Sequence, residues 1–211
     1  MREPINVSGM VLSASPVGEY DKRVVILTRE LGKIIAFARG ARRMKSPLMA
    51  VSNPFVFGEF QVYEGRDSYT LSSANIKEYF LDLAQMQPGV YYGFYFLELA
   101  EYFGQEGNDE TQMLNLLYVT MNAIRRGKQD LRLIRCIFEL RTITISGEAP
   151  QMFSCMECGT KENLTVFSLR DSAIYCQNCG KTIRDPWALQ PGTVLACRYI
   201  IAAPLAKLYG L

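Results

Sequence analysis

The sequence predicts an α+β protein of several parts, in which an N-terminal β-barrel precedes a helical bundle with an inserted four-cysteine knuckle. Apolar residues alternate with period two in short segments up to about residue 80, and they recur at helical spacing from about residue 87. Two Cys-x-x-Cys pairs follow in the last third of the chain. A chain of 211 residues has room for more than one core. The parts we expect are residues 1–80, 81–149, 150–186 and 187–211.

The N-terminal part has the pattern of five short strands separated by turn residues. We expect the strands at residues 7–14, 23–29, 33–39, 55–63 and 68–73. Pro16 and Gly18 lie in the first turn, and Gly32 makes the second connection short enough for a hairpin. Five strands in roughly 75 residues, with a longer connection after the third, are typical of a small closed barrel such as the OB-fold.

A run of positive charge begins in the third predicted strand and continues beyond it. No acidic residue lies between Glu30 and Glu59, although the whole chain is nearly neutral, with a formal charge of +2. The basic residues of this interval are Lys33, Arg39, Arg42, Arg43 and Lys45. Because so much like charge in a short segment creates a strong local field, phosphate is the first candidate ligand.

The third predicted strand has two different faces. Alternation places Lys33, Phe37 and Arg39 on one face and small or aliphatic residues on the other. On OB-type barrels, bases stack on aromatic rings of the exposed face while basic groups hold the backbone. Phe37 therefore either stacks on bases or packs as an ordinary core residue, and the pattern leaves both interpretations open.

The second part of the chain is predicted to be helical. A first helix begins near Pro88 and carries aromatic residues at helical spacing, which indicates a core face rather than a binding platform. These residues are Tyr91 or Tyr92, Tyr95 or Phe96, and Tyr102 or Phe103. Further helices are expected over about 109–127 and 130–147, and a later one starts at Pro191.

Charge is also sorted along the helical part. Residues 78–124 include seven acidic residues and no basic one, whereas the segment that follows is basic. Its cations are Arg125, Arg126, Lys128, Arg132 and Arg135. They are candidates to bind an acidic peptide tail or a phosphate backbone. A solvated helix face with pairs such as Arg135 and Glu139 predicts the same pattern, so both interpretations stay open.

The most specific motif is a pair of knuckles, Cys155 with Cys158 and Cys176 with Cys179, separated by 17 residues. This spacing is typical of a four-thiolate zinc site, and a redox dithiol pair is the main rival. Since the chain has no histidine, zinc sites that need an imidazole are excluded. We therefore expect one structural zinc ion, in a closed site without a catalytic position.

The residues around the knuckles carry two smaller predictions. The glycine that follows each pair, Gly159 or Gly180, can take a positive φ and let backbone N–H groups approach the thiolates. The remaining cysteines, Cys136 and Cys197, lie in helical patterns and are predicted to be small buried apolar groups.

The sequence lacks the motifs that several classes of enzyme require. There is no GxxxxGK[ST] phosphate loop, no histidine and no close carboxylate pair at metal-binding spacing, so we expect a protein that is not an enzyme. The N-terminus lacks an apolar h-region, and the most apolar later run carries Glu98 and Glu101, so we expect a cytoplasmic protein. An alternative is a zinc-ribbon and barrel adaptor in transcription or translation.

Nearly the whole chain resembles the bacterial recombination mediator family RecO. The resemblance lies in the segments 11–22, 27–33, 36–43, 58–60 and 69–74, and in the order of barrel, helices and inserted knuckle. It implies a DNA repair protein that binds single- and double-stranded DNA and anneals complementary strands. It also implies work with RecR, contact with the acidic tail of single-stranded-DNA-binding protein, and help in loading RecA onto coated strands.

The resemblance also assigns residues. The basic barrel surface of the family falls on Lys33, Arg39, Arg42, Arg43 and Lys45, and its zinc ligands fall on the four knuckle cysteines. Some family members lack these cysteines, which implies that zinc is not central to the activity. RecO chains usually continue through another helix beyond the position of Leu211, so the resemblance implies a longer helical part than this sequence contains.

Overall fold

The structure is a computed structural model that describes residues 3–210. Two compact units make up the chain, Met1–Arg135 and Cys136–Leu211. The barrel and the first two long helices thus share one unit, and the finer four-part division stays a prediction. Among the described residues, no helix is long and apolar enough to cross a membrane.

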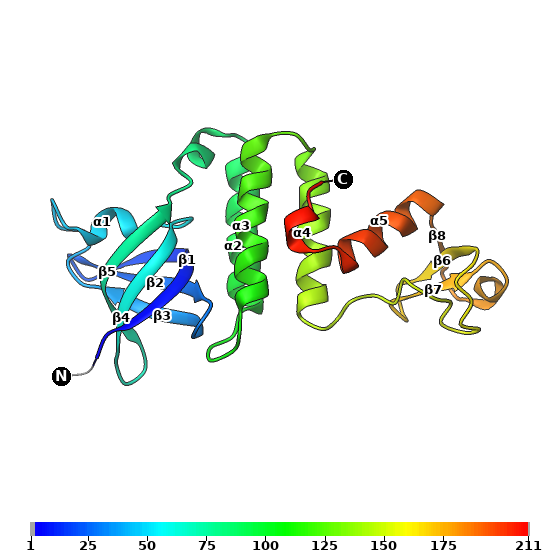
Figure 1. The fold of residues 1–211 in the computed structure, drawn as a ribbon, viewed down its shortest axis with the longest axis horizontal. Coiled ribbons are helices and arrows are strands. Elements are labelled where there is room, and N and C mark those ends of the chain that lie inside the picture. Colours follow the sequence, from blue (N-terminus) through cyan, green and yellow to red (C-terminus); the bar gives the residue numbers. More distant parts are fainter. Residues whose placement is uncertain (1–2, 211) are drawn as a thin grey trace. The chain divides into compact units, whose positions relative to one another are not determined.

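The first unit begins with a closed five-stranded barrel (Figure 1). Its strands are β1 (Ile5–Val17), β2 (Asp21–Thr28), β3 (Gly32–Ala38), β4 (Phe57–Glu64) and β5 (Tyr69–Glu78). The strand order is β1-β2-β3-β5-β4, with β4 closing back onto β1, and only β3 and β5 pair in parallel. This order confirms the OB-like barrel predicted from the sequence. The short helix α1 (Leu48–Val51) lies in the long connection after β3 and was not predicted.

The barrel interior confirms the predicted two faces of β3. Ile34, Ala36 and Ala38 are fully buried in the barrel core, whereas the residues between them are half-buried on the outer side. The core continues past the strand, because Ala41 and Leu48 belong to the same cluster. Both ends of the basic loop between β3 and α1 are therefore fixed by burial.

Two antiparallel helices cover part of the barrel's outer face. They are α2 (Gly89–Phe103) and α3 (Thr111–Arg126), which pack against each other, with α2 also against β1 and β2 and α3 against β2. Val25 and Leu27 of β2 are buried although they lie outside the barrel core cluster. The helices thus cover Val25 and Leu27 on the outer side of β2.

The loop between α2 and α3, residues 104–110, fastens these helices to the turn between β2 and β3. We name this loop the strap. Lys33 N donates to Gln105 O at 2.9 Å, and Gly107 N donates to Leu31 O at 3.0 Å. Gly32 has φ +69°, and a Cβ there would lie 2.2 Å from the Gln105 carbonyl oxygen. Only glycine permits so close an approach at this φ.

The helix α4 (Leu131–Ile145) runs across the division between the units, and the second unit contains the remaining elements. A three-stranded sheet is formed by β6 (Leu164–Ser168), β7 (Ala173–Cys176) and β8 (Trp187–Ala188). The helix α5 (Pro191–Ala202) starts at the predicted proline.

The Arg141 guanidinium of α4 donates to the backbone carbonyls of Ile200 and Ile201 near the end of α5. The 3-10 turns are η1 (Leu81–Gln85), η2 (Cys179–Thr182) and η3 (Leu205–Lys207).

Two predictions about burial in the helices are wrong. The aromatic stripe of α2 is only partly core, because Phe96 is fully buried but Tyr91 and Tyr102 are exposed. Helical spacing of apolar rings cannot distinguish a ring that packs from one whose edge faces solvent. Cys136 is exposed, and Cys197 is half-buried beside the core of the second unit.

Candidate nucleic-acid interface and metal centre

The basic loop after β3 is held against the turn between β1 and β2. Arg42 N donates to Tyr20 O at 2.8 Å, and Arg42 Nη1 donates to Gly18 O at 3.2 Å. The Asp21 carboxylate accepts a hydrogen bond of 2.7 Å from Gly40 N. These contacts fix the loop backbone, so its guanidinium groups are presented from a rigid support.

The same turn supplies residues that the sequence analysis did not single out. The Arg43 guanidinium lies over the Tyr20 ring, 4.8 Å from its centroid, in a cation–π contact. Lys22 donates to the Asn53 side-chain oxygen at 2.7 Å, and burial together with the nearby Arg42 lowers the pKa of Lys22. Tyr20 could be suspected only from its place in a turn, because its partner Arg43 is distant in sequence.

The residues of the predicted binding face of β3 lie in different environments. Lys33 points to the helices and donates from Nζ to Glu101 O at 2.6 Å, so its ammonium group helps to fasten α2. Phe37 is half-buried on the outer face, with Arg23 as its register partner on β2 and Thr70 on β5. Arg39 is exposed at the end of the strand.

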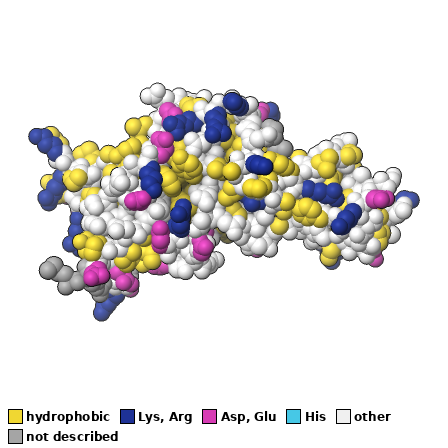
Figure 2. Space-filling view, in the orientation of Figure 1, with side chains coloured by type: hydrophobic (Ala, Val, Ile, Leu, Met, Phe, Trp, Pro, Cys, Tyr) yellow, Lys and Arg dark blue, Asp and Glu magenta, His cyan; other side chains and the backbone are white. Residues whose placement is uncertain are grey.

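We name the surface that results the cationic barrel end. It consists of Arg23, Arg39, Arg42, Arg43 and Lys45. Figure 2 shows Lys and Arg side chains projecting at its left edge, where Figure 1 places α1. Of the six residues predicted to bind DNA, Arg39, Arg42, Arg43 and Lys45 lie together here, Phe37 lies beside them, and Lys33 does not.

The predicted basic edge of the helices is not one surface. Arg125 forms ion pairs with Glu78 at 3.0 Å and with Asp82 at 2.6 Å. Its guanidinium also lies 5.4 Å from the ring centroid of Phe80. These partners precede α2 in the chain, so Arg125 joins the end of α3 to the segment that leaves the barrel.

The other predicted arginines of this edge are exposed. Arg126 is at the end of α3, and Arg132 pairs with Asp130 at 3.0 Å. Arg135 lies 5.4 Å from the ring centroid of Tyr95, and with Tyr91, Tyr92 and Tyr95 it lines a pocket of about 240 Å³. The exposed Tyr91 and the half-buried Tyr92 and Tyr95 of α2 thus share a pocket with one of the predicted cations.

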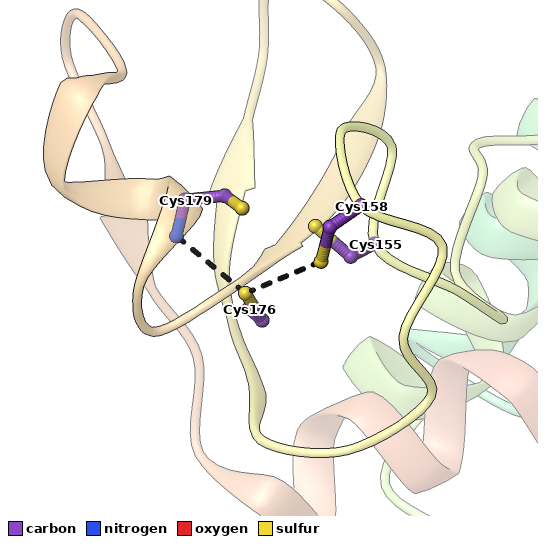
Figure 3. Close-up of side chains that lie close together, drawn as sticks. All are labelled: Cys155, Cys158, Cys176 and Cys179. Carbon is purple, nitrogen blue, oxygen red and sulfur yellow. Dashed lines mark hydrogen bonds between the residues drawn. The ribbon is translucent and has the colours of Figure 1, made fainter.

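The four knuckle cysteines come together at one end of the small sheet (Figure 3). Their Sγ atoms all lie within 4.8 Å of one another. The Sγ atoms of Cys158 and Cys176 are 3.9 Å apart. Tetrahedral coordination with metal–sulfur bonds of about 2.3 Å places neighbouring sulfurs about 3.8 Å apart. The four thiols therefore fit a single tetrahedral metal ion.

Backbone N–H groups surround the thiols, as Figure 3 shows for the bond of 3.5 Å from Cys179 N to Cys176 Sγ. Burial tends to raise the pKa of Cys155, but backbone N–H groups led by that of Cys158 lower it to about 6. Hydrogen bonding to Cys176 and Cys158 raises the pKa of Cys179 to about 12. Thiols this close compete for negative charge, which a divalent cation would relieve.

The two glycines after the knuckles have different roles. Gly159 has φ +73° with open space around it, which confirms the prediction of positive φ. Gly180 lies in η2 without a positive φ, so that prediction is wrong. A Cβ at Gly180 would lie 2.6 Å from Val166 Cγ2, so contact with β6, rather than backbone conformation, requires glycine here.

Fold and cysteine cluster together define a class: an OB-like barrel protein with C-terminal helices and a four-thiolate cluster that could hold a metal ion. Comparison with known families gives the particular member of this class. The family described as "Recombination protein O N terminal" matches residues 1–80, and "Recombination protein O C terminal" matches residues 89–211. The chain belongs to the RecO family of DNA repair proteins.

Comparison with individual proteins gives the same family. The chain is 33% identical to DNA repair protein RecO of Alkaliphilus metalliredigens over 97% of this chain and 83% of that protein. It is 32% identical to DNA repair protein RecO of Bacillus pumilus over 88% of this chain and 71% of that protein. Similarity therefore extends through both units.

The Arg125 ion pairs predict a pH-dependent contribution to stability. Replacing Arg125 by Ala should lower the free energy of unfolding by about 1–2 kcal/mol near neutral pH. Burial tends to raise the pKa of Glu78, but hydrogen bonds led by that of Arg125 hold it below its usual value. The contribution is therefore complete above the unfolded-state pKa of about 4.3 and fades as pH falls through the lower folded-state pKa.

Urea unfolding between about pH 7 and pH 3 measures this effect, because the loss begins only below the unfolded-state pKa. Arg126→Ala is the matched control, because Arg126 is the neighbouring arginine and is exposed. Equal destabilisation by the two substitutions, or an effect of Arg125→Ala that does not shrink in acid, would contradict the assignment.

Proposed function

We propose that this protein is a recombination mediator that binds single- and double-stranded DNA on the cationic barrel end and anneals complementary strands. Its family supports this role, together with the further proposal that it works with RecR to load RecA onto strands coated by single-stranded-DNA-binding protein. The observation that carries the DNA-binding proposal is the fixed loop, in which Arg42 and Arg43 are held against the β1–β2 turn.

The proposed mechanism is electrostatic and involves no chemical step. Guanidinium and ammonium groups neutralise phosphates and release counterions, so binding tolerates any sequence and weakens with salt. Two strands screened on one cationic surface repel each other less, while their bases stay available for pairing. The protein therefore acts by binding rather than by catalysis.

Replacing Arg42 and Arg43 together by Ala tests the DNA-binding surface. Affinity for single-stranded DNA should fall, and the slope of log affinity against log salt should lose about 0.7 for each phosphate contact removed. Fluorescence anisotropy of a labelled oligonucleotide across a salt series measures both quantities. Arg66→Ala is the control, because Arg66 is an exposed arginine of the hairpin between β4 and β5.

Unchanged affinity of the double variant at low salt would refute this surface assignment. Competition by RNA of the same length separates the proposal from an adaptor role in transcription or translation. RNA that displaces DNA at low molar excess would favour the adaptor.

We propose that the metal held by the four cysteines is one structural zinc ion. Cys155 and Cys176 belong to the small core of the second unit, so coordination would link two loops through groups that are already buried. Zinc suits this donor set because it accepts four thiolates in tetrahedral geometry. A bound zinc ion would cross-link the two knuckles, and with four thiolate ligands it would have no open coordination position.

Metal analysis of the freshly purified protein should find about one zinc per chain. Cys176→Ser should lower that content and increase the hydrogen exchange of residues 151–188, because metal binding is coupled to folding. Cys197→Ser keeps the cluster intact and serves as the control. Protein that contains no zinc before any chelator is added would remove the proposal.

We propose that the pocket lined by Tyr91, Tyr92, Tyr95 and Arg135 binds the acidic tail of single-stranded-DNA-binding protein. Carboxylates of such a peptide would be attracted by Arg135 and the nearby Arg132, and apolar side chains would pack on the tyrosine rings. Arg132 pairs with Asp130, but its side chain is 84% exposed and stays accessible to a peptide. Arg125 is excluded from this role because its side chain is only 33% exposed and its guanidinium pairs with both Glu78 and Asp82.

Titration of a labelled tail peptide tests this pocket. Arg132→Glu with Arg135→Glu should weaken peptide binding about tenfold, since reversing two exposed cations removes two attractions of up to about 1 kcal/mol each and adds repulsion. Tyr91→Ala, at a ring that is 62% exposed, should weaken it without altering stability. Arg66→Glu controls for net charge. Equal losses from Arg66→Glu and the double variant would show a general electrostatic effect instead of a pocket.

A further inference from the structure

An exposed methionine stands at the tip of the basic loop. Met44 is 88% exposed, the highest fraction among the exposed large hydrophobic side chains of the described residues. Its neighbours in the chain are Arg43 and Lys45, both of the cationic barrel end. At this exposure the Met44 side chain contributes little to the barrel core and is accessible to a ligand.

The tip that carries Met44 is held in one conformation. Ser46 N donates to Arg43 O at 3.1 Å, which closes a turn around Met44 and Lys45. Lys45 has φ +64°, a backbone conformation that residues other than glycine rarely adopt. On either side of the turn, Ala41 and Leu48 are buried in the barrel core. A projection fixed in this way loses little backbone freedom when it binds.

We propose that Met44 is an apolar wedge that inserts between adjacent base pairs of duplex DNA bound on the cationic barrel end. This inference rests on the proposed DNA binding and adds an action on the DNA to it. Proteins that kink duplexes insert apolar side chains, Met among them, between base steps while cations hold the flanking phosphates. The tip combines both parts, because Arg42, Arg43 and Lys45 flank the apolar side chain.

Duplex DNA suits this tip better than a single strand does. Bases of a single strand already splay apart, and proteins bind them by stacking on aromatic platforms rather than by wedging. Met44 offers an unbranched, flexible side chain and no ring, which fits a narrow gap between base pairs. Flexible pyrimidine–purine steps should be the preferred points of insertion because they unstack most easily.

A duplex containing 2-aminopurine next to a central TA step tests the wedge, because this base brightens when it loses its stacking partner. Binding of the 211-residue chain should raise the fluorescence, and anisotropy of a second label should report binding independently. Met44→Ser should lose the fluorescence rise but still bind the duplex through its unchanged cations. Met44→Leu keeps an apolar tip and should retain the rise. Leu81→Ser, at another exposed apolar residue (72%), should also retain it.

The two readouts distinguish the wedge from the DNA binding on which it rests. Duplex binding by the wild-type chain without a fluorescence rise would overturn the wedge alone, as would a rise that persists in Met44→Ser. Absence of any anisotropy change at low salt would overturn duplex binding and the wedge together. A rise lost in both Met44→Ser and Leu81→Ser would also overturn the wedge, because loss of any exposed apolar group would then suffice.

Discussion

The close approach of the strap to the β2–β3 turn determines which part of the barrel remains available for a ligand. Gly32 lets the Gln105 carbonyl approach the turn, and Lys33 then donates to Gln105 from its backbone and to Glu101 from its side chain. The helices consequently cover the outer side of Val25 and Leu27. What remains open is the opposite end of the same strands, where the charge lies. Docking of the helices and placement of the proposed binding surface thus both depend on this contact.

The barrel could be predicted because it depends on local information. Period-two alternation, glycines in the tight turns and a long third connection suffice to predict five strands and a small closed barrel. The alternation of β3 was also correct residue by residue, since Ile34, Ala36 and Ala38 are buried. Strand ends differ from the prediction by a few residues because pairing with a neighbour, rather than composition, determines where a strand stops.

The candidate site was predicted less completely because its contacts join residues that are distant in the chain. Charge density singled out Arg42 and Arg43 as candidates, but not the Tyr20 ring and backbone that hold them. Charge density also grouped Arg125 with Arg135, although one lies in ion pairs and the other lines a pocket. A count of charges describes how much field a segment can produce, whereas the partner of each cation depends on tertiary structure.

The two units differ in what holds them together, which separates the roles of metal and charge. The first unit has a barrel core of aliphatic and aromatic residues under its cationic end. The sheet of the second unit has strands of only five, four and two residues, and two of the four clustered thiols belong to its core. So small a sheet buries little apolar area, and a metal ion supplies the missing stabilisation in such modules. A metal held by the cysteines would therefore stabilise the second unit, whereas the arginine loop of the first unit is fixed by its own barrel.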